Sequence, residues 1–160
     1  MTATALAILA DEGRLAWEDP VMDRLKGFRM ADPYVSRHMT VRDLLVHRSG
    51  LGLGQGDLLF WPGTNFTRAE LVERIGRLPL RNGFRSGYAY DNVLYIVAGE
   101  VAAAVSGRTW DEFVSSALFA PLGMSRSATS LAGVDPANSV ATHVTPSDNT
   151  QAAGRVVAME

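Results

Sequence analysis

Cysteine is absent from the 160-residue sequence, and lysine occurs only once, at Lys26. Without cysteine, the chain can form no disulfide, thiolate nucleophile or zinc–cysteine site, and its redox compartment stays undetermined. A formal net charge of -2 gives no electrostatic reason to expect a nucleic-acid partner. No apolar run approaches the roughly 18 residues that a membrane-spanning helix needs. The sequence therefore predicts no nucleic-acid binding and no membrane span.

The composition is that of an ordinary globular domain, with 47% hydrophobic and 20% charged residues. At this length, folding buries roughly 70% of the unfolded surface, so one domain over residues 1–160 is expected. Met1 leads directly into a helical pattern, with no basic segment of the kind that opens a secretory signal. We therefore expect the chain to begin inside a structural element, and its cellular location is not predicted.

Apolar periodicity predicts a buried helix at the centre of the fold. The stretch from Asn92 to about Ser106, ended by Gly107, is apolar around more than half of its circumference. A further helix is predicted over residues 2–12, with Gly13 as the glycine that ends it. Its apolar face is formed by Ala5, Leu6, Leu9 and Ala10.

Three further helix starts are marked by a threonine followed three residues later by an acidic residue, since such a pair can cap the first turn reciprocally. These capping boxes begin at Thr40, Thr67 and Thr109. The helices that they predict span 41–48, 68–78 and 110–119. On the first of these, Arg42 and Arg48 beside Asp43 form the pattern of a solvated face.

The segments between these helices carry weaker patterns. Asp19 is expected to cap a short helix with Pro20 at its first position. Residues 28–39 are mixed in polarity and interrupted by proline, which predicts a loop. Residues 154–159 suggest a strand, for which we expect no partner in this chain. The sequence therefore predicts a helical part over 1–127 and an irregular tail over 128–160.

Familiar nucleophile and metal signatures are missing. No Gly-x-Ser-x-Gly elbow occurs, and the spacing of His38, His47 and His143 is not that of a metal site, so no metal or other cofactor is expected. His47 is interpreted as a hydrogen-bond partner at the end of a predicted helix rather than as a base. The glycines in residues 50–56 do not match a dinucleotide fingerprint and predict a flexible loop.

The triplet Tyr90-Asp91-Asn92 stands where the central predicted helix begins. Helix starts leave backbone donors free, and a rigid scaffold holds side chains still, so such a position can present chemistry. A tyrosine there is more often a packing residue whose hydroxyl satisfies a backbone group. The triplet alone therefore does not decide between these roles.

Four segments, taken in order, carry more information. They are TATALAILADEGRLAWEDPV after Met1, TVRDLLVHRSGL from Thr40, the Tyr90–Asn92 triplet with its helix, and FAPLGM from Phe119. Together they resemble the serine hydrolases of the penicillin-binding-protein and β-lactamase-like family. The resemblance is strongest to the class C β-lactamase, D-Ala-D-Ala carboxypeptidase and EstB-type esterase branch. In that family, the matching segments follow the catalytic Ser-x-x-Lys, form a T-x-R-x-L-L-x-H-x-S-G-L stretch, and supply Tyr-x-Asn and P-L-G-M.

The resemblance implies a fold, a reaction and two site residues. The chain is expected to be mainly α, the helical subdomain of a β-lactamase-like α+β fold with little of the antiparallel sheet. The full-length parent would act on a small-molecule or peptide acyl substrate through a serine acyl-enzyme. Tyr90 would take part in proton transfer with the family's lysine, and Asn92 would orient that lysine and the substrate. The loop with Phe60 and Trp61 would form either a substrate rim or a surface-packed aromatic pair.

Two family motifs are missing. Asp23 lies three residues before Lys26, so no Ser-x-x-Lys occurs, and no Lys-Thr-Gly or His-x-Gly follows. Ser147-Asp148-Asn149 spells a motif of the class A branch, but it stands in the polar tail and is interpreted as coincidence. We therefore expect a chain truncated at both ends and inactive alone. The alternative is a non-catalytic helical interaction domain. Apolar faces of the first and central helices are expected to stay exposed and to favour self-association.

Overall fold

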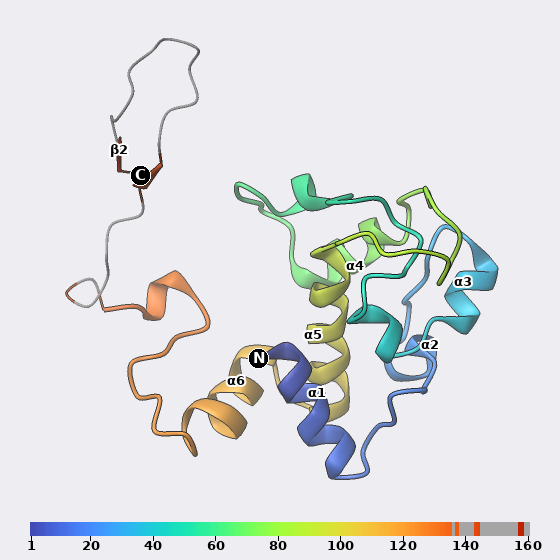
Figure 1. Cartoon of the computed structure of the whole chain (residues 1–160). Coiled ribbons are helices and arrows are strands. Elements are labelled where there is room, and N and C mark those ends of the chain that lie inside the picture. Colours follow the sequence, from blue (N-terminus) through green and yellow to red (C-terminus); the bar gives the residue numbers. More distant parts are fainter. Residues whose placement is uncertain (136, 138–142, 145–156, 159–160) are drawn as a thin grey trace. The chain divides into compact units, whose positions relative to one another are not determined.

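A computed structural model describes residues 1–135, 137, 143–144 and 157–158. Contacts divide the chain into two compact units, Met1–Met124 and Ser125–Glu160. The first unit contains α1 to α6 and the candidate site (Figure 1). Its described elements are all helical, so the mainly α prediction is confirmed for this unit.

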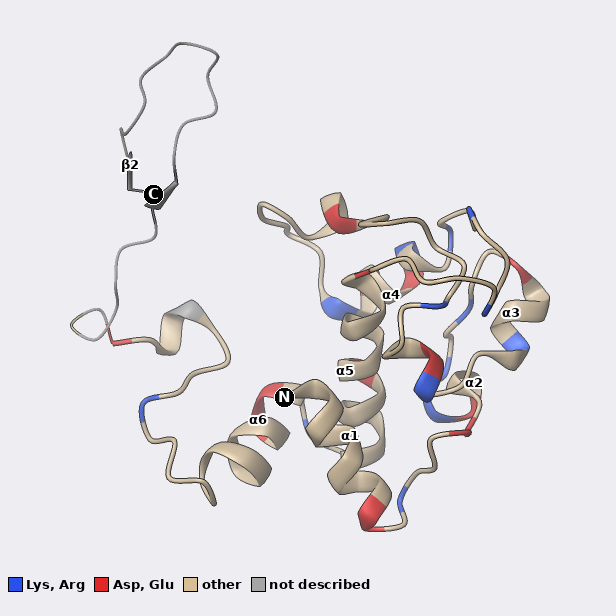
Figure 2. Cartoon of the chain, in the orientation of Figure 1, with Lys and Arg blue, Asp and Glu red and all other residues tan. Residues whose placement is uncertain are grey.

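Helix α5, Val93–Ser106, is the centre of the first unit, and α1, Thr2–Asp11, packs against it. Both helices are almost entirely uncharged in Figure 2. The large apolar residues on the inner face of α5 are fully buried: Val93, Leu94, Val97 and Val101. Gly107, with φ of 72°, ends the helix in the left-handed conformation that glycine tolerates. The predicted central buried helix is therefore confirmed.

Two of the predicted capping boxes form in full. Thr67 begins α4, Arg68–Ile75, and Thr109 begins α6, Trp110–Val114, which continues as the π-helical turn η3, Ser115–Phe119. In both, the threonine hydroxyl and the acidic side chain three residues later accept each other's backbone N–H groups. The first of these helices ends three residues earlier than predicted. Both α4 and α6 contact α5.

The third capping box does not lead to the predicted helix. Thr40 and Asp43 form the expected hydrogen bonds, but only a 3₁₀ turn follows, η1, Arg42–Leu44. The prediction of a helix over 41–48 was wrong, because His47 adopts a left-handed backbone, with φ of 57°, that ends any helix.

The solvated face predicted around Asp43 was also wrong. Asp43 is only 5% exposed, and Arg85 donates two hydrogen bonds to its carboxylate, one of them at 2.6 Å. Arg42 does lie in solvent, where it pairs with Glu18. The buried carboxylate therefore ties the η1 turn to the segment that precedes the candidate site.

Two short helices were misplaced or missed. In α2, Val21–Arg24, the N-cap is Pro20 rather than Asp19, whose carboxylate instead accepts from Ala16 and Arg24. The predicted loop over residues 28–39 contains α3, Pro33–His38. Its N-cap, Asp32, accepts hydrogen bonds from the N–H groups of Tyr34 and Val35. The signal was present, since aspartate followed by proline is a common helix start.

The second unit contains the short helix η4, Leu131–Gly133, and two strands. β1, His143–Val144, pairs antiparallel with β2, Val157–Ala158, and His143 lies opposite Ala158. The terminal strand therefore has a partner in this chain, against our prediction. Ser147-Asp148-Asn149 lies outside the described residues.

Exposed large apolar side chains are spread over the described residues. The most exposed are Leu53 and Leu58, at 80% and 89%. Both belong to the loop before α4. Self-association through α1 and α5 stays a prediction. None of the described helices is both long enough and apolar enough to cross a membrane.

Candidate functional site

The triplet Tyr90-Asp91-Asn92 lies immediately before α5, where the sequence predicts it. Asn92 is the N-cap residue, but its own side chain caps no backbone group. The side chain of Asp91 caps the helix instead, since its Oδ1 accepts a hydrogen bond from the N–H of Leu94 at 3.3 Å. The Asn92 amide is thus left free to face the neighbouring loop and Tyr90.

Tyr90 and Asn92, the two residues that the sequence singles out, are in direct contact. The Tyr90 hydroxyl donates to Asn92 Oδ1 at 2.7 Å. Tyr90 is 44% exposed, so its phenol is accessible from solvent. Its ring lies against the His47 ring, with 4.6 Å between the centroids. An accessible hydroxyl held by one fixed acceptor is suited to exchanging a proton with a bound molecule.

The glycine-containing loop folds against this pair. The N–H of Gly54 donates to the Tyr90 carbonyl at 2.9 Å. Asp57, the first residue of the 3₁₀ turn η2, Asp57–Leu59, accepts from Asn92 Nδ2 at 3.1 Å. The sequence gave no specific indication of Asp57, which is 35 residues away from Asn92. Phe60 packs against the core, whereas Trp61 is 59% exposed.

Ser49, His47 and Asp91 lie together beneath Tyr90, but they are not arranged as a catalytic triad. The Ser49 hydroxyl donates to Asp91 Oδ2 at 3.2 Å and is itself only 1% exposed. His47 Nδ1 accepts from the backbone N–H of Asp91 at 3.3 Å. In a triad the serine would instead be bound to the histidine and open to substrate. His47 is therefore a hydrogen-bond partner, as the sequence suggested, and Ser49 is a buried support.

The buried Asp91 carboxyl has an altered acidity. Burial raises the pKa of Asp91 above its ordinary value of 3.8. Hydrogen bonds from Leu94 and Ser49 and the His47 ring lower it by less, and the Asp57 carboxylate adds to the rise. A raised folded-state pKa means that the folded state binds more protons than the unfolded state above pH 3.8. The stabilisation that this carboxyl contributes is therefore greatest below pH 3.8, and it is lost as the pH rises through the folded-state pKa.

Replacing Asp91 with asparagine should leave the free energy of unfolding at pH 7 unchanged to within about 1 kcal/mol. The amide can keep the bond to Leu94 without a buried charge. Urea unfolding of the wild-type chain and of Asp91→Asn from pH 3.5 to pH 7 tests this. The stability of the variant relative to wild type should rise with pH. A loss of more than about 2 kcal/mol at pH 7 would show that the charge itself stabilises the fold.

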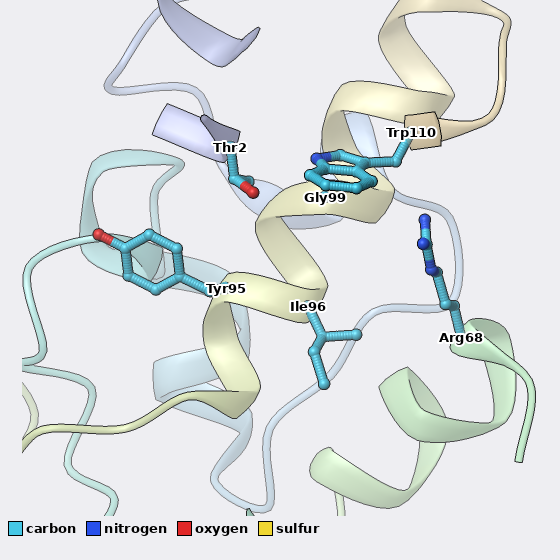
Figure 3. A pocket seen from close by; sticks show the side chains of 6 residues that line it. All are labelled: Thr2, Arg68, Tyr95, Ile96, Gly99 and Trp110. Carbon is cyan, nitrogen blue, oxygen red and sulfur yellow. The ribbon is translucent and has the colours of Figure 1, made fainter. Parts of the chain in front are cut away.

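A separate pocket of about 220 Å³ lies beside α5 and away from the Tyr90 hydroxyl. Figure 3 shows Thr2, Ile96, Gly99 and Trp110 around it, and the Tyr95 hydroxyl directed away from them. That hydroxyl donates to the Leu45 carbonyl. The only charged group lining the pocket, Arg68, is paired with Asp111 at 3.0 Å. No carboxylate, histidine or lysine is among the side chains that line this pocket.

Among the described residues, no group of three or more histidine, cysteine, aspartate or glutamate side chains is placed to hold a metal ion. The polar groups that the structure brings together at the site are the phenol of Tyr90, the amide of Asn92 and the carboxylate of Asp57.

Comparison with known proteins yields a consistent set of relatives. The family model described as Beta-lactamase matches residues 1–160. Penicillin-binding protein 4 of Amycolatopsis lactamdurans is 31% identical over 129 residues, which are 80% of this chain and 33% of that protein. The chain thus spans about a third of the length of this relative.

Two solved structures extend the comparison. D-amino acid amidase from Ochrobactrum anthropi SV3 is 28% identical with a TM-score of 0.63, covering 78% of this chain and 37% of the amidase. A penicillin binding protein from Bacillus halodurans, 24% identical, has a TM-score of 0.73 and covers 98% of this chain and 46% of that protein. At that identity the second match shows the fold alone.

Proposed function

Because the chain belongs to the Beta-lactamase family of serine hydrolases, we propose that it supplies the tyrosine and asparagine of a serine acyl-transfer site. The reaction is attack of a serine hydroxyl on an amide, β-lactam or ester carbonyl, followed by hydrolysis of the acyl-enzyme. The observation that carries the proposal is the 2.7 Å bond from the accessible Tyr90 hydroxyl to Asn92. The likeness to penicillin-binding proteins and a D-amino acid amidase supports it.

In this reaction each residue has a separate role. Tyr90 relays the proton between the attacking serine and the family's lysine: the phenol accepts the serine proton as it passes its own proton to the lysine amine, and the proton is returned to the leaving group by the same route. Asn92 offers an amide that orients the lysine and the substrate. Ser49 and His47 bind Asp91, which caps the first turn of α5 and so holds Tyr90 and Asn92 in place.

These 160 residues do not supply the nucleophilic serine and the lysine of the family's Ser-x-x-Lys motif. Lys26 is the only lysine, and Asp23 stands three residues before it. We therefore propose that the site is completed by polypeptide outside these 160 residues, and that the chain alone forms no acyl-enzyme.

Covalent labelling tests this directly. The purified 160-residue chain should not be labelled by a fluorescent penicillin and should not hydrolyse p-nitrophenyl acetate above the buffer rate. Sequencing the reading frame upstream should find Ser-x-x-Lys shortly before Met1, and the longer product should be labelled or should hydrolyse the ester. Labelling of the short chain would contradict the division of the site. Absence of Ser-x-x-Lys upstream would favour the non-catalytic interaction domain.

A further inference from the structure

Asp57 is brought to the candidate site by an unusually close backbone approach. It follows Gly56, whose φ of 93° is left-handed. A Cβ atom at Gly56 would lie 2.8 Å from Leu78 Cδ1 and 2.9 Å from Val93 Cγ1. Only glycine therefore lets the loop lie this close to the first turn of α5. The bond from the Gly54 N–H to the Tyr90 carbonyl holds the same loop in place.

The Asp57 carboxylate determines which way round the Asn92 amide lies. An ionised carboxylate can only accept hydrogen bonds, so it must face the Nδ2 end of the amide. Asn92 Nδ2 donates to Asp57 Oδ2 at 3.1 Å, which turns Oδ1 toward Tyr90. If the amide were reversed, its oxygen would face the carboxylate, and two acceptors would repel each other. The orientation of the Tyr90 acceptor thus depends on Asp57.

The Asp57 carboxylate has few partners apart from Asn92 among the described residues. Its Oδ1 is buried and has no hydrogen-bond partner among the described residues. The salt bridges found in the described part of the chain do not include it. The bond from Asn92 Nδ2 is therefore the side-chain hydrogen bond that the structure shows for the Asp57 carboxylate.

We propose that Asp57 is a positioning residue that fixes the Asn92 amide so that its oxygen accepts the hydrogen bond of the Tyr90 hydroxyl. With its hydroxyl hydrogen directed to Asn92 before the reaction, the Tyr90 oxygen presents its lone pairs to the group that enters the site. The inference rests on the proposed function for its catalytic meaning. The orientation itself is a property of the free chain and needs no substrate.

Asp57→Asn tests the proposal, because the new amide keeps the shape of aspartate but can offer either an oxygen or an NH₂ group. The experiment is NMR of the ¹⁵N-labelled 160-residue chain, reading the solvent exchange of the Asn92 side-chain amide. In Asp57→Asn this exchange should become faster, because a neutral acceptor replaces the charged one and the new amide can also turn its NH₂ group toward Asn92. The Tyr90 ring resonances should shift. Asp57→Ala is the second variant; it removes the acceptor, and the exchange should become about tenfold faster, as expected for loss of a hydrogen bond to a charged group.

Two controls distinguish a specific effect on Asn92 from a general loss of structure in the chain. The Asn82 side chain donates to the Leu51 carbonyl at 3.2 Å, and its exchange should not change. Asp11→Asn makes the same chemical change at an exposed site at the end of α1 and should leave Asn92 unchanged. Unchanged Asn92 exchange in both Asp57 variants, or equal acceleration at Asn82 and Asn92, would overturn the proposal. Neither result depends on the labelling experiment, so the two proposals fail independently.

Discussion

Asp43→Asn is expected to lower the free energy of unfolding by about 2 to 4 kcal/mol at pH 7. The Asp43 carboxylate accepts two hydrogen bonds from Arg85 and two from Thr40, and it is only 5% exposed. An amide cannot accept all four, and its NH₂ group must face a donor. The Arg85 side chain is 48% exposed, so solvent relieves part of the loss.

The same substitution should change how stability depends on pH. Burial raises the pKa of Asp43, but the hydrogen bonds from Arg85 and Thr40 and the charge of Arg85 outweigh it, so the pKa lies below 3.8. A lowered folded-state pKa gives stability that is fully present above pH 3.8 and is lost as the pH falls through the folded value. Asp43→Asn should remove this loss, so the two unfolding curves should converge at acidic pH.

Urea unfolding of the purified chain at pH 7 and at pH 3 measures both effects. Glu18→Gln is the matched control, since it makes an acid-to-amide change in the exposed pair of Glu18 with Arg42. That variant should change stability by less than about 1 kcal/mol. If Asp43→Asn behaves like the control at pH 7, the ion pair of Asp43 with Arg85 does not stabilise the fold.

Tyr90→Phe should lower the turnover of an ester or β-lactam by about 10²- to 10⁴-fold in the longer protein that carries Ser-x-x-Lys. The change removes only the hydroxyl, which forms one hydrogen bond, to Asn92 Oδ1. Because the side chain is 44% exposed, the free energy of unfolding should fall by less than about 1 kcal/mol. Proton transfer would be lost while the fold is kept.

Tyr88→Phe provides the control for this substitution. Tyr88 is 70% exposed, and its ring also contacts His47, yet it stands outside the Tyr-x-Asn motif. Removing the hydroxyl of Tyr88, whose ring contacts His47 as the Tyr90 ring does, should therefore have little effect on kcat. Steady-state hydrolysis of p-nitrophenyl acetate compares the variants. Equal activity of Tyr90→Phe and Tyr88→Phe would remove Tyr90 from the mechanism.

Asp43 and Asp91 show that burial alone does not determine whether the pKa of a carboxyl group is raised or lowered. Both are buried, but Asp43 faces a guanidinium, whereas Asp91 faces a hydroxyl and a neighbouring carboxylate. The pKa is therefore lowered in one and raised in the other. The sequence offers no such distinction, since Arg85 is 42 residues from Asp43.

The sequence by itself determined the central helix α5, the helices that begin after Thr67 and Thr109, and the position of Tyr90 and Asn92. The capping boxes at Thr67 and Thr109, the glycine that ends α5 and the apolar surface of α5 all depend on residues within one or two helical turns. Interactions at that range form between neighbours in the chain, so their pattern can be read directly.

Tertiary structure decided the environment of the site. Thr40 and Asp43 satisfy the local rule for a helix start, but the left-handed His47 ends the turn, and Asp43 pairs with Arg85 instead. The bond from Asn92 to Asp57 joins residues 35 positions apart. Such partners meet only when the loop has closed and Gly56 lies against α5, and the entropy of that closure is balanced by the packing of the whole unit. No local pattern encodes that balance, so the sequence located the Tyr90–Asn92 pair but not the carboxylate that faces it.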